Sequence, residues 1–342
     1  MDVLCHHRAS TIRHAPAALQ AAGAWRTTAV LRFIVHRLLA TIPVVGVVAL
    51  FVFLLLHLSP GDPATVIAGD YASPADVQRI RATLGLDDPL PIQFGNWVWR
   101  LAQGDLGISI FSNLPVSRLI AQRLEPTLML ALVTITLSVL IAVPLGVLAA
   151  WKSGTWIDRA VMIFAVVGFS VPVFVLGYIL IFVFSLEFKW LPVQGYRSPA
   201  DGLWPFLRHI ILPAITLSAI YIALIARITR ASVLEVLEED YVRTARAKGQ
   251  SEGKVLMFHA LRNAAVPIVT VIGIGVALLI GGVVVTESVY NIPGLGRLVV
   301  DAILKRDYPI IQGLIMMFSM VYILVNLVID ILYTMLDPRI RY

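Results

Sequence analysis

Charged side chains are scarce in this chain, and one polar stretch collects many of them. The segment 238–263 reads EEDYVRTARAKGQSEGKVLMFHALRN and holds nine charged side chains, although only 14% of the 342 residues are charged. Within it, Arg246 and Lys248 offer cationic donors for ion pairs, and small residues around Gly249 would let a partner approach closely. Docking onto a soluble protein is one interpretation. The alternative is an amphipathic basic segment that lies on the anionic inner leaflet of a membrane.

The letters GQSEGKV within this stretch resemble a phosphate-binding loop, but the spacing is wrong. That motif requires four residues between its first two glycines and a Ser or Thr directly after the lysine. Here three residues separate Gly249 from Gly253, and Val255 follows Lys254. We therefore expect this chain to bind no ATP and no other cofactor.

The sequence indicates neither a metal site nor a catalytic group. The seven histidines are scattered, and none has the His-Glu-x-x-His spacing that places two ligands on one helix face. Cys5 is the single cysteine, so neither an intrachain disulfide nor a thiolate cluster can form. The apolar segments lack the Ser/Lys or paired Asp groups of an intramembrane enzyme. We expect no metal and no enzymatic activity.

Polar residues inside the apolar segments are candidates for a substrate path, because they are costly to bury in a bilayer. The candidates are Thr134, Thr136, Ser138, Asn326, Asp330 and, at the outer end of its segment, Glu287. Asn326 and Asp330 lie one helical turn apart near the inner surface. They either line an exit or pair with a neighbouring helix, and we favour helix packing for them.

The elements that carry these residues follow from hydropathy. A helix needs about 20 apolar residues to cross a hydrocarbon core of about 30 Å. Six segments meet this length or approach it: 38–58, 127–150, 160–186, 210–226, 266–285 and 310–332. With a mean hydropathy of +0.85, they predict an all-α polytopic membrane protein. Pro43, Pro144 and Pro172 lie in the first three segments, where we expect kinks and not helix ends.

The distribution of Lys and Arg orients the chain, because these residues favour the cytoplasmic side. With the N-terminus inside, 16 basic residues lie in inner segments and six lie in the two short outer loops. The inner segments are 1–37, 151–159, 227–262 and 333–342, and the outer loops are 187–209 and 286–309. We expect both termini in the cytoplasm. The net charge of +6 is then a property of this face and no sign of nucleic-acid binding.

The same segments divide the chain into parts. We expect a cytoplasmic tail over 1–29, a first transmembrane helix over 30–58, an extracytoplasmic helical domain over 59–126, and a core with five helices over 127–342. In the outer domain, Ser73 can cap a helix that starts at Pro74 and ends at Gly85.

The core includes an inner segment over 232–262 that is predicted to form two helices joined by a glycine turn. The first helix covers 232–248, and its apolar side repeats every four residues at Val233, Leu237, Tyr241 and Ala245. Gly249 suits the left-handed conformation that ends such a helix. Ser251 can cap a second helix over 252–262.

The strings EEDYVRTARAKG and HALRNAAVP in this region resemble the coupling segment of ABC importer permeases, the membrane subunits of binding-protein-dependent transport systems. The wider family reads Glu-Ala-Ala, three residues, Gly, nine residues, then Ile-x-Leu-Pro. Only Ala245, Gly249 and Leu261 match that pattern, and His259 and Arg262 replace its Ile and Pro. These departures are typical of the dipeptide/oligopeptide/nickel branch.

Further strings along the chain resemble the same branch, in the same order. They are FLLLHLSPGDPA (53–64), GDLGIS (104–109), RLEPTLMLAL (123–132), HIILPAITL (209–217), RITRASVLEVL (227–237), YNIPGLGRL (290–298), RDYPIIQG (306–313) and LDPRIRY (336–342). The resemblance covers about residues 30 to 342.

The resemblance implies a type I ABC importer permease fold with six transmembrane helices in the bacterial inner membrane. It implies a second permease subunit, two ATPase subunits that bind ATP and Mg²⁺, and an extracytoplasmic substrate-binding protein as partners. It further implies that this chain contacts an ATPase through Asp240, Tyr241, Arg243, Thr244, Ala245, Arg246, Ala247, Lys248, Gly249, Ser251, His259, Leu261 and Asn263.

For the cargo, the resemblance favours di- and oligopeptides. Nickel chelates, glutathione-like compounds and haem are alternatives within the same class of importer. A secondary transporter driven by an ion gradient is the alternative class. It would call for inverted repeats or charged relays at the midplane, and the sequence has neither.

Overall fold

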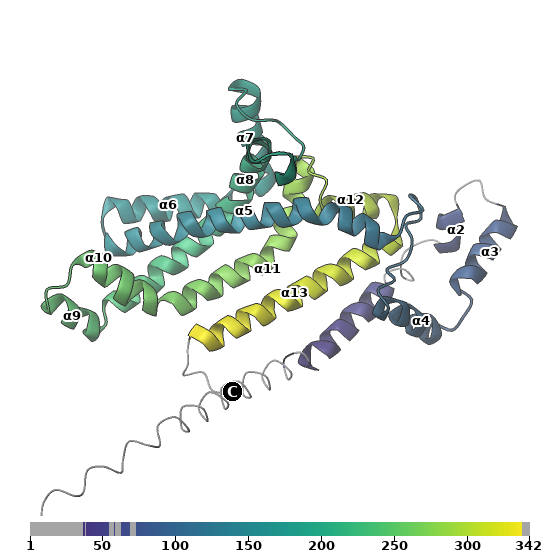
Figure 1. The fold of residues 1–342 in the computed structure, drawn as a ribbon, viewed down its shortest axis with the longest axis horizontal. Coiled ribbons are helices and arrows are strands. Elements are labelled where there is room, and N and C mark those ends of the chain that lie inside the picture. The colour runs from purple at the N-terminus through teal and green to yellow at the C-terminus, as the bar shows by residue number, and fades with distance from the viewer. Residues whose placement is uncertain (1–36, 38, 55–57, 59–62, 69–72, 337–342) are drawn as a thin grey trace, which may run out of the picture.

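The computed structural model describes residues 37, 39–54, 58, 63–68 and 73–336. The predicted tail over 1–29 and the end of the LDPRIRY string lie outside the described residues. In the part described, the secondary structure is helical, apart from an isolated bridge between Ile108 and Pro115. Figure 1 shows long helices running side by side, with α9 and α10 near one end and α12 and α2 to α4 near the other.

Four described helices are long and apolar enough to cross a membrane: α5 (Val116–Trp151), α8 (Leu203–Leu237), α11 (Ala265–Val289) and α13 (Tyr308–Leu336). A bent pair, formed by α6 (Trp156–Ser170) with α7 (Val173–Leu180) and its π-helical extension η1 (Ile181–Glu187), makes a fifth candidate. A shorter apolar helix, Leu39–Leu54, precedes them. The predicted all-α polytopic fold is thus confirmed, and six membrane segments are compatible with it.

The prolines within the apolar segments behave differently from one another. Pro144 lies inside α5, which continues through it as predicted. The expected single kinked helix over 160–186 is wrong, because α6 ends at Ser170 and the pair is bent by 102°. Val171 has an extended backbone (φ −83°, ψ 123°). The ring of Pro172 excludes the α-region from the residue before it, so the helix ends there.

Helix α8 lies at the centre of the core. In its most apolar stretch 67% is buried, against 33% or less in α5, α11 and α13. The largest buried cluster includes Leu130 of α5 with Ile210, Leu217 and Ile225 of α8. Helices α5 and α8 approach closely at Gly146, where an added Cβ would lie 2.6 Å from the Cβ of Thr229. Small residues permit such close contact between membrane helices.

The hydroxyl of Tyr290, at the end of α11, anchors α7. It lies 2.7 Å from the Oγ1 of Thr216 on α8 and donates to the backbone oxygen of Gly177 on α7 at 3.3 Å. A tyrosine hydroxyl is protonated at neutral pH and can donate, and burial raises the pKa of Tyr290 further. One side chain therefore joins three helices.

Three helices lie between the first apolar helix and α5 in the described part of the chain: α2 (Pro63–Ala68), α3 (Pro74–Leu84) and α4 (Leu90–Ala102). Helix α3 starts at Pro74 and is followed by Gly85 with φ of +66°, as the positions of this proline and this glycine predict. Phe94 and Trp97 of α4 pack on Phe53 of the first apolar helix, with ring centroids 5.3 and 6.1 Å from it. These aromatic residues form a small core between α4 and that helix.

Candidate functional site: the polar segment between α8 and α11

The polar segment (238–263) begins with a break that the sequence did not predict. A single helix was expected over 232–248, but α8 ends at Leu237 and α9 (Asp240–Ala247) starts anew. Glu239 between them has an extended backbone (φ −68°, ψ 144°). The break allows α9 to contact the following π-helix and to bury Val242 and Ala245. A straight continuation of α8 would leave these apolar side chains in water.

Gly249 ends α9 as the sequence predicts. Its φ is +77°, its N–H donates to the oxygen of Arg246 at 2.9 Å, and the N–H of Gln250 donates to the oxygen of Ala245 at 3.3 Å. These two bonds form a Schellman motif, which satisfies carbonyl groups at a helix end. The left-handed φ favours glycine because it has no Cβ.

The second helix of the polar segment is mostly a π-helix. After α10 (Glu252–Lys254), the chain forms η3 (Val255–Leu261) where an α-helix was expected. Ser251 has the extended backbone of an N-cap residue, but its side chain makes no capping hydrogen bond. In η3, Val255 and Ala260 are fully buried. Short π-helices are frequent at functional sites.

A buried apolar cluster fixes η3 to the membrane helices. Ala260 packs in this cluster with Ala150 of α5 and Val233 of α8, and Leu261 packs against it. The polar segment is therefore attached to α5 and α8 through side-chain packing as well as through the chain itself.

Polar side chains join α9 and the glycine turn to α10, to η3 and to the residues directly after η3. The guanidinium of Arg246 pairs with the carboxylate of Glu252 at 2.9 and 3.3 Å. Two further contacts of 2.9 Å join His259 Nε2 to Gln250 Oε1, and Asn263 Nδ2 to the hydroxyl of Tyr241. The structure thus brings Arg246, His259, Asn263 and Tyr241 into one folded unit. Glu252 and Gln250 were missed, because a partner across a turn has no fixed sequence spacing.

Most of the other predicted contact residues lie on the outside of this unit. Asp240, Arg243, Thr244, Ala247, Lys248, Gly249 and Ser251 are exposed, and Ala245 is buried. Arg243 lies 3.4 Å from Asp240, and Thr244 donates to the oxygen of Asp240. Large apolar side chains are also exposed: Tyr241 at 43%, Met257 at 57% and Phe258 at 67%. Exposed apolar patches among polar side chains are found at surfaces that bind a protein or a membrane.

The candidates for a substrate path do not gather in one site. On α5, Thr134 and Ser138 are fully buried, and Ser138 donates to the oxygen of Thr134 at 2.7 Å. Thr136 on the same helix is exposed. On α13, Asn326 donates to Tyr322 of its own helix. Asp330, also on α13, pairs with Arg37 at 2.6 Å. Asp330 thus contacts the region of the first helix.

Glu287 is fully buried near the C-terminal end of α11, where it caps α12 (Leu295–Lys305). Its carboxylate accepts from Thr127 Oγ1 at 2.6 Å and from the N–H of Arg297 at 3.0 Å. Thr127 Oγ1 in turn accepts from the N–H of Leu295 at 2.8 Å. A carboxylate near the free N–H groups of a helix start is stabilising. A role for Glu287 in a substrate path stays a prediction.

No group of three or more His, Cys, Asp or Glu side chains in the described part of the chain could hold a metal ion. The polar segment contains ion pairs and exposed apolar side chains on one folded unit.

Comparisons with known proteins identify the family. Residues 142–342 match the model of the binding-protein-dependent transport system inner membrane component, and residues 30–131 match the model of its N-terminal part. A Sinorhizobium fredii protein named "Probable peptide ABC transporter permease protein y4tP" is 56% identical, over 91% of this chain and 99% of its own length. The Escherichia coli K12 "Glutathione transport system permease protein GsiC" is 47% identical, over 91% and 99% respectively.

A solved structure supports the fold. The permease fold in "Inward facing conformations of the MetNI methionine ABC transporter" superposes with a TM-score of 0.54 at 17% identity, covering 65% of this chain and 97% of that one. The predicted type I importer fold is confirmed, as is the prediction of a transport permease and not an enzyme. The chain therefore belongs to the family of inner membrane components of binding-protein-dependent transport systems, the multi-pass permease subunits of ABC importers.

Proposed function

We propose that this chain is the permease subunit of an ATP-driven importer that takes up di- and oligopeptides by alternating access. The observation that carries the cargo class is the 56% identity to a relative named as a peptide ABC transporter permease, over 99% of that relative's length. The bent span and the packed α5–α8 core supply rigid elements that can rock between two arrangements.

The proposed coupling runs through the polar segment. Partner ATPase subunits would bind ATP and Mg²⁺, and this chain would contact one of them through residues 240–251. The surface around Gly249 is exposed, and the Arg246–Glu252 pair holds its shape. Because η3 packs against α5 and α8, a push on the polar segment would move the inner ends of these helices as rigid levers.

The proposed setting is the bacterial inner membrane, with both termini and the polar segment in the cytoplasm. The excess of Lys and Arg in the segments on that side supports this orientation. The complex would contain a second, homologous permease subunit, two ATPase subunits and an extracytoplasmic binding protein that selects the cargo.

Glutathione is the second candidate cargo, because a relative named as a glutathione transport permease is 47% identical over nearly its whole length. Both candidates are small peptides with a charged amine and carboxylates. The difference between them would lie mainly in the binding protein.

Reconstitution tests the proposal. The permease would be purified with the second permease, the ATPases and the binding protein that the proposal assigns to it, and placed in liposomes. We expect uptake of a radiolabelled dipeptide, tripeptide or glutathione that needs both ATP inside and the binding protein outside. Uptake driven by a proton or sodium gradient without ATP would contradict the proposal and favour a secondary transporter.

A further inference from the structure

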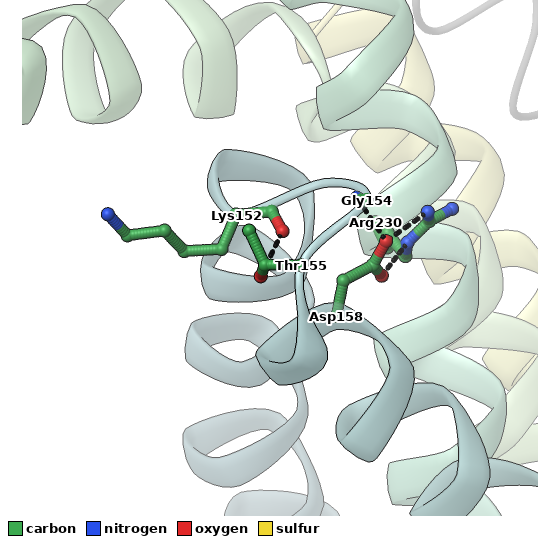
Figure 2. Close-up of polar contacts among 5 residues, drawn as sticks. All are labelled: Lys152, Gly154, Thr155, Asp158 and Arg230. Atoms are coloured by element: carbon green, nitrogen blue, oxygen red, sulfur yellow. Dashed lines mark hydrogen bonds and ion pairs between the residues drawn. The ribbon is translucent and has the colours of Figure 1, made fainter.

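An ion pair joins α6 to the inner part of α8, outside the polar segment. The guanidinium of Arg230 donates to the carboxylate of Asp158 through Nε and Nη2, at 2.5 and 2.7 Å (Figure 2). The side chain of Asp158 is 7% exposed and that of Arg230 is 25% exposed. Bidentate pairs of this kind fix the relative orientation of two groups as well as their distance.

The turn before α6 holds the carboxylate in place. The N–H of Gly154, whose φ is +78°, donates to Asp158 Oδ2 at 3.0 Å. Thr155 closes the same turn by donating through Oγ1 to the oxygen of Lys152 at 2.6 Å. In Figure 2 the side chain of Lys152 points away from the pair. Asp158 thus receives a backbone donor from its own turn and the guanidinium from α8.

Arg230 lies in the part of α8 that leads into the polar segment. From there α8 continues for about two turns to Leu237, and Val233 on the way packs with Ala150 and Ala260 in the cluster that fixes η3. A displacement of the polar segment therefore reaches Arg230 through a short, rigid stretch.

Apolar packing between α6 and α8 is incomplete beyond the pair. A cavity of about 140 Å³ is lined by Ala165 and Phe169 of α6 and by Ala223 and Arg227 of α8, among others. The helices come close again at Gly168, where an added Cβ would lie 3.3 Å from the oxygen of Ala219. The Asp158–Arg230 pair is thus the polar link that holds the inner end of this helix pair.

We propose that Asp158 and Arg230 are positioning residues that make α6 move together with the inner end of α8 during transport. The force that the polar segment receives then reaches α6 and, at its far end, the break before α7. This inference rests on the proposed function, because it assumes that an ATPase moves the polar segment.

Neutralising one partner of the Asp158–Arg230 pair, called the clamp from here on, tests the proposal in the reconstituted importer. Asp158→Asn or Arg230→Gln should lower the amount of substrate imported per ATP hydrolysed about tenfold, a size that couplings between contacting residues reach. ATP hydrolysis itself should persist. Arg230→Lys keeps the charge but loses the bidentate geometry. Its transport ratio, the amount of substrate imported per ATP hydrolysed, should therefore be intermediate. Wild-type ratios in Asp158→Asn and Arg230→Gln would overturn the proposal.

Arg227→Gln is the matched control. It removes the same charge from the same helix one turn earlier, and Arg227 makes no ion pair with any described residue. We expect Arg227→Gln to keep most of the transport ratio, and an equal loss in it would overturn the proposal. Should the single variants fail to assemble, the double variant Asp158→Asn/Arg230→Gln leaves no unpaired charge. The clamp predicts a lowered ratio there also.

A cross-link tests the joint motion directly. In a Cys5→Ser background, Asp158→Cys and Arg230→Cys remove the pair and allow a short bismaleimide to join the two helices. We expect the cross-link to restore the transport ratio that the double cysteine variant has lost. If the helices slide past each other during transport, the cross-link will abolish uptake, and the clamp is wrong.

The two proposals fail in different ways. Absence of ATP-dependent uptake in the wild-type importer contradicts the proposed function. Normal ATP-dependent uptake in the wild type together with unchanged variants contradicts only the clamp.

Discussion

At the scale of single residues, Gly249 and Glu287 show how local geometry depends on the identity of one residue. Gly249 has open space around its Cα but a left-handed backbone. Glu287 has the opposite situation, with an ordinary helical backbone in a crowded site. Substitution at the first position causes backbone strain, and substitution at the second leaves donors without acceptors.

Gly249→Val should uncouple ATP hydrolysis from transport while the protein still inserts into the membrane. A β-branched residue in the left-handed region costs about 1–3 kcal/mol, which would distort the turn at the tip of the polar segment. Uptake per ATP measures the effect. Gly249→Asn should be milder, because Asn tolerates this conformation.

The control for this variant is Gly253→Val. Gly253 lies in α10 with nothing within 4 Å of an added Cβ, and its backbone is helical. We expect near-normal coupling in it. An import rate of Gly249→Val equal to that of the wild type would show that the turn is not the coupling element.

Glu287→Ala should lower the thermal stability of the purified protein. It leaves the hydroxyl of Thr127 and the N–H of Arg297 without their acceptor, and each buried group left unpaired costs about 1–3 kcal/mol. Gly294→Ala should act similarly, because its Cβ would overlap the carboxylate of Glu287. A thermal unfolding curve in detergent measures both.

Glu238→Ala, which removes an exposed carboxylate, serves as the control and should unfold at the wild-type temperature. Should Glu287→Ala be as stable as the wild type but defective in uptake, the capping role is wrong and the role in a substrate path is favoured.

At the scale of elements, the bent pair α6–α7 is held from two sides. The Asp158–Arg230 pair holds the start of α6 to α8. Beyond the bend, Tyr290 joins α7 to α8 and α11. The break at Val171 lies between these two attachments, so each half of the span can follow a different neighbour.

Tyr290→Phe should destabilise the protein by about 0.5–1.5 kcal/mol, the usual net contribution of a hydrogen bond. The ring and its packing stay, and only the hydroxyl that joins α7 to α8 is lost. Thermal unfolding measures the change, with Tyr322→Phe on an exposed part of α13 as the control. An unchanged unfolding temperature in Tyr290→Phe would show that the hydroxyl does not anchor α7.

At the scale of the whole molecule, the polar segment and the α11–α12 connection lie near opposite ends of the long helices (Figure 1). Exposed apolar side chains such as Ile163 and Phe164 cover the outside of α6, as expected where lipid or a second subunit surrounds a helix. A bilayer across the long helices would therefore place the polar segment and the outer loops on different sides.

Single cysteines in a Cys5→Ser background test this orientation. In intact cells with a permeable outer membrane, a membrane-impermeant maleimide should label Asp201→Cys, in the outer connection before α8. Gly253→Cys, in the polar segment, should react only after the inner membrane is opened. The reverse pattern would show that the chain is inserted the other way round.

The sequence by itself determined the class of protein, the approximate membrane segments and the turn at Gly249. These features depend on local properties: the length of an apolar run, or the backbone freedom of one residue. Only the tertiary structure decided that Pro172 ends a helix whereas Pro144 does not, and that α9 breaks away from α8 to bury Val242. It also decided which polar groups pair. Asp158 with Arg230 and Glu287 with Thr127 are brought together by helix packing, because contacts between residues so far apart in the chain have no spacing that a sequence can reveal.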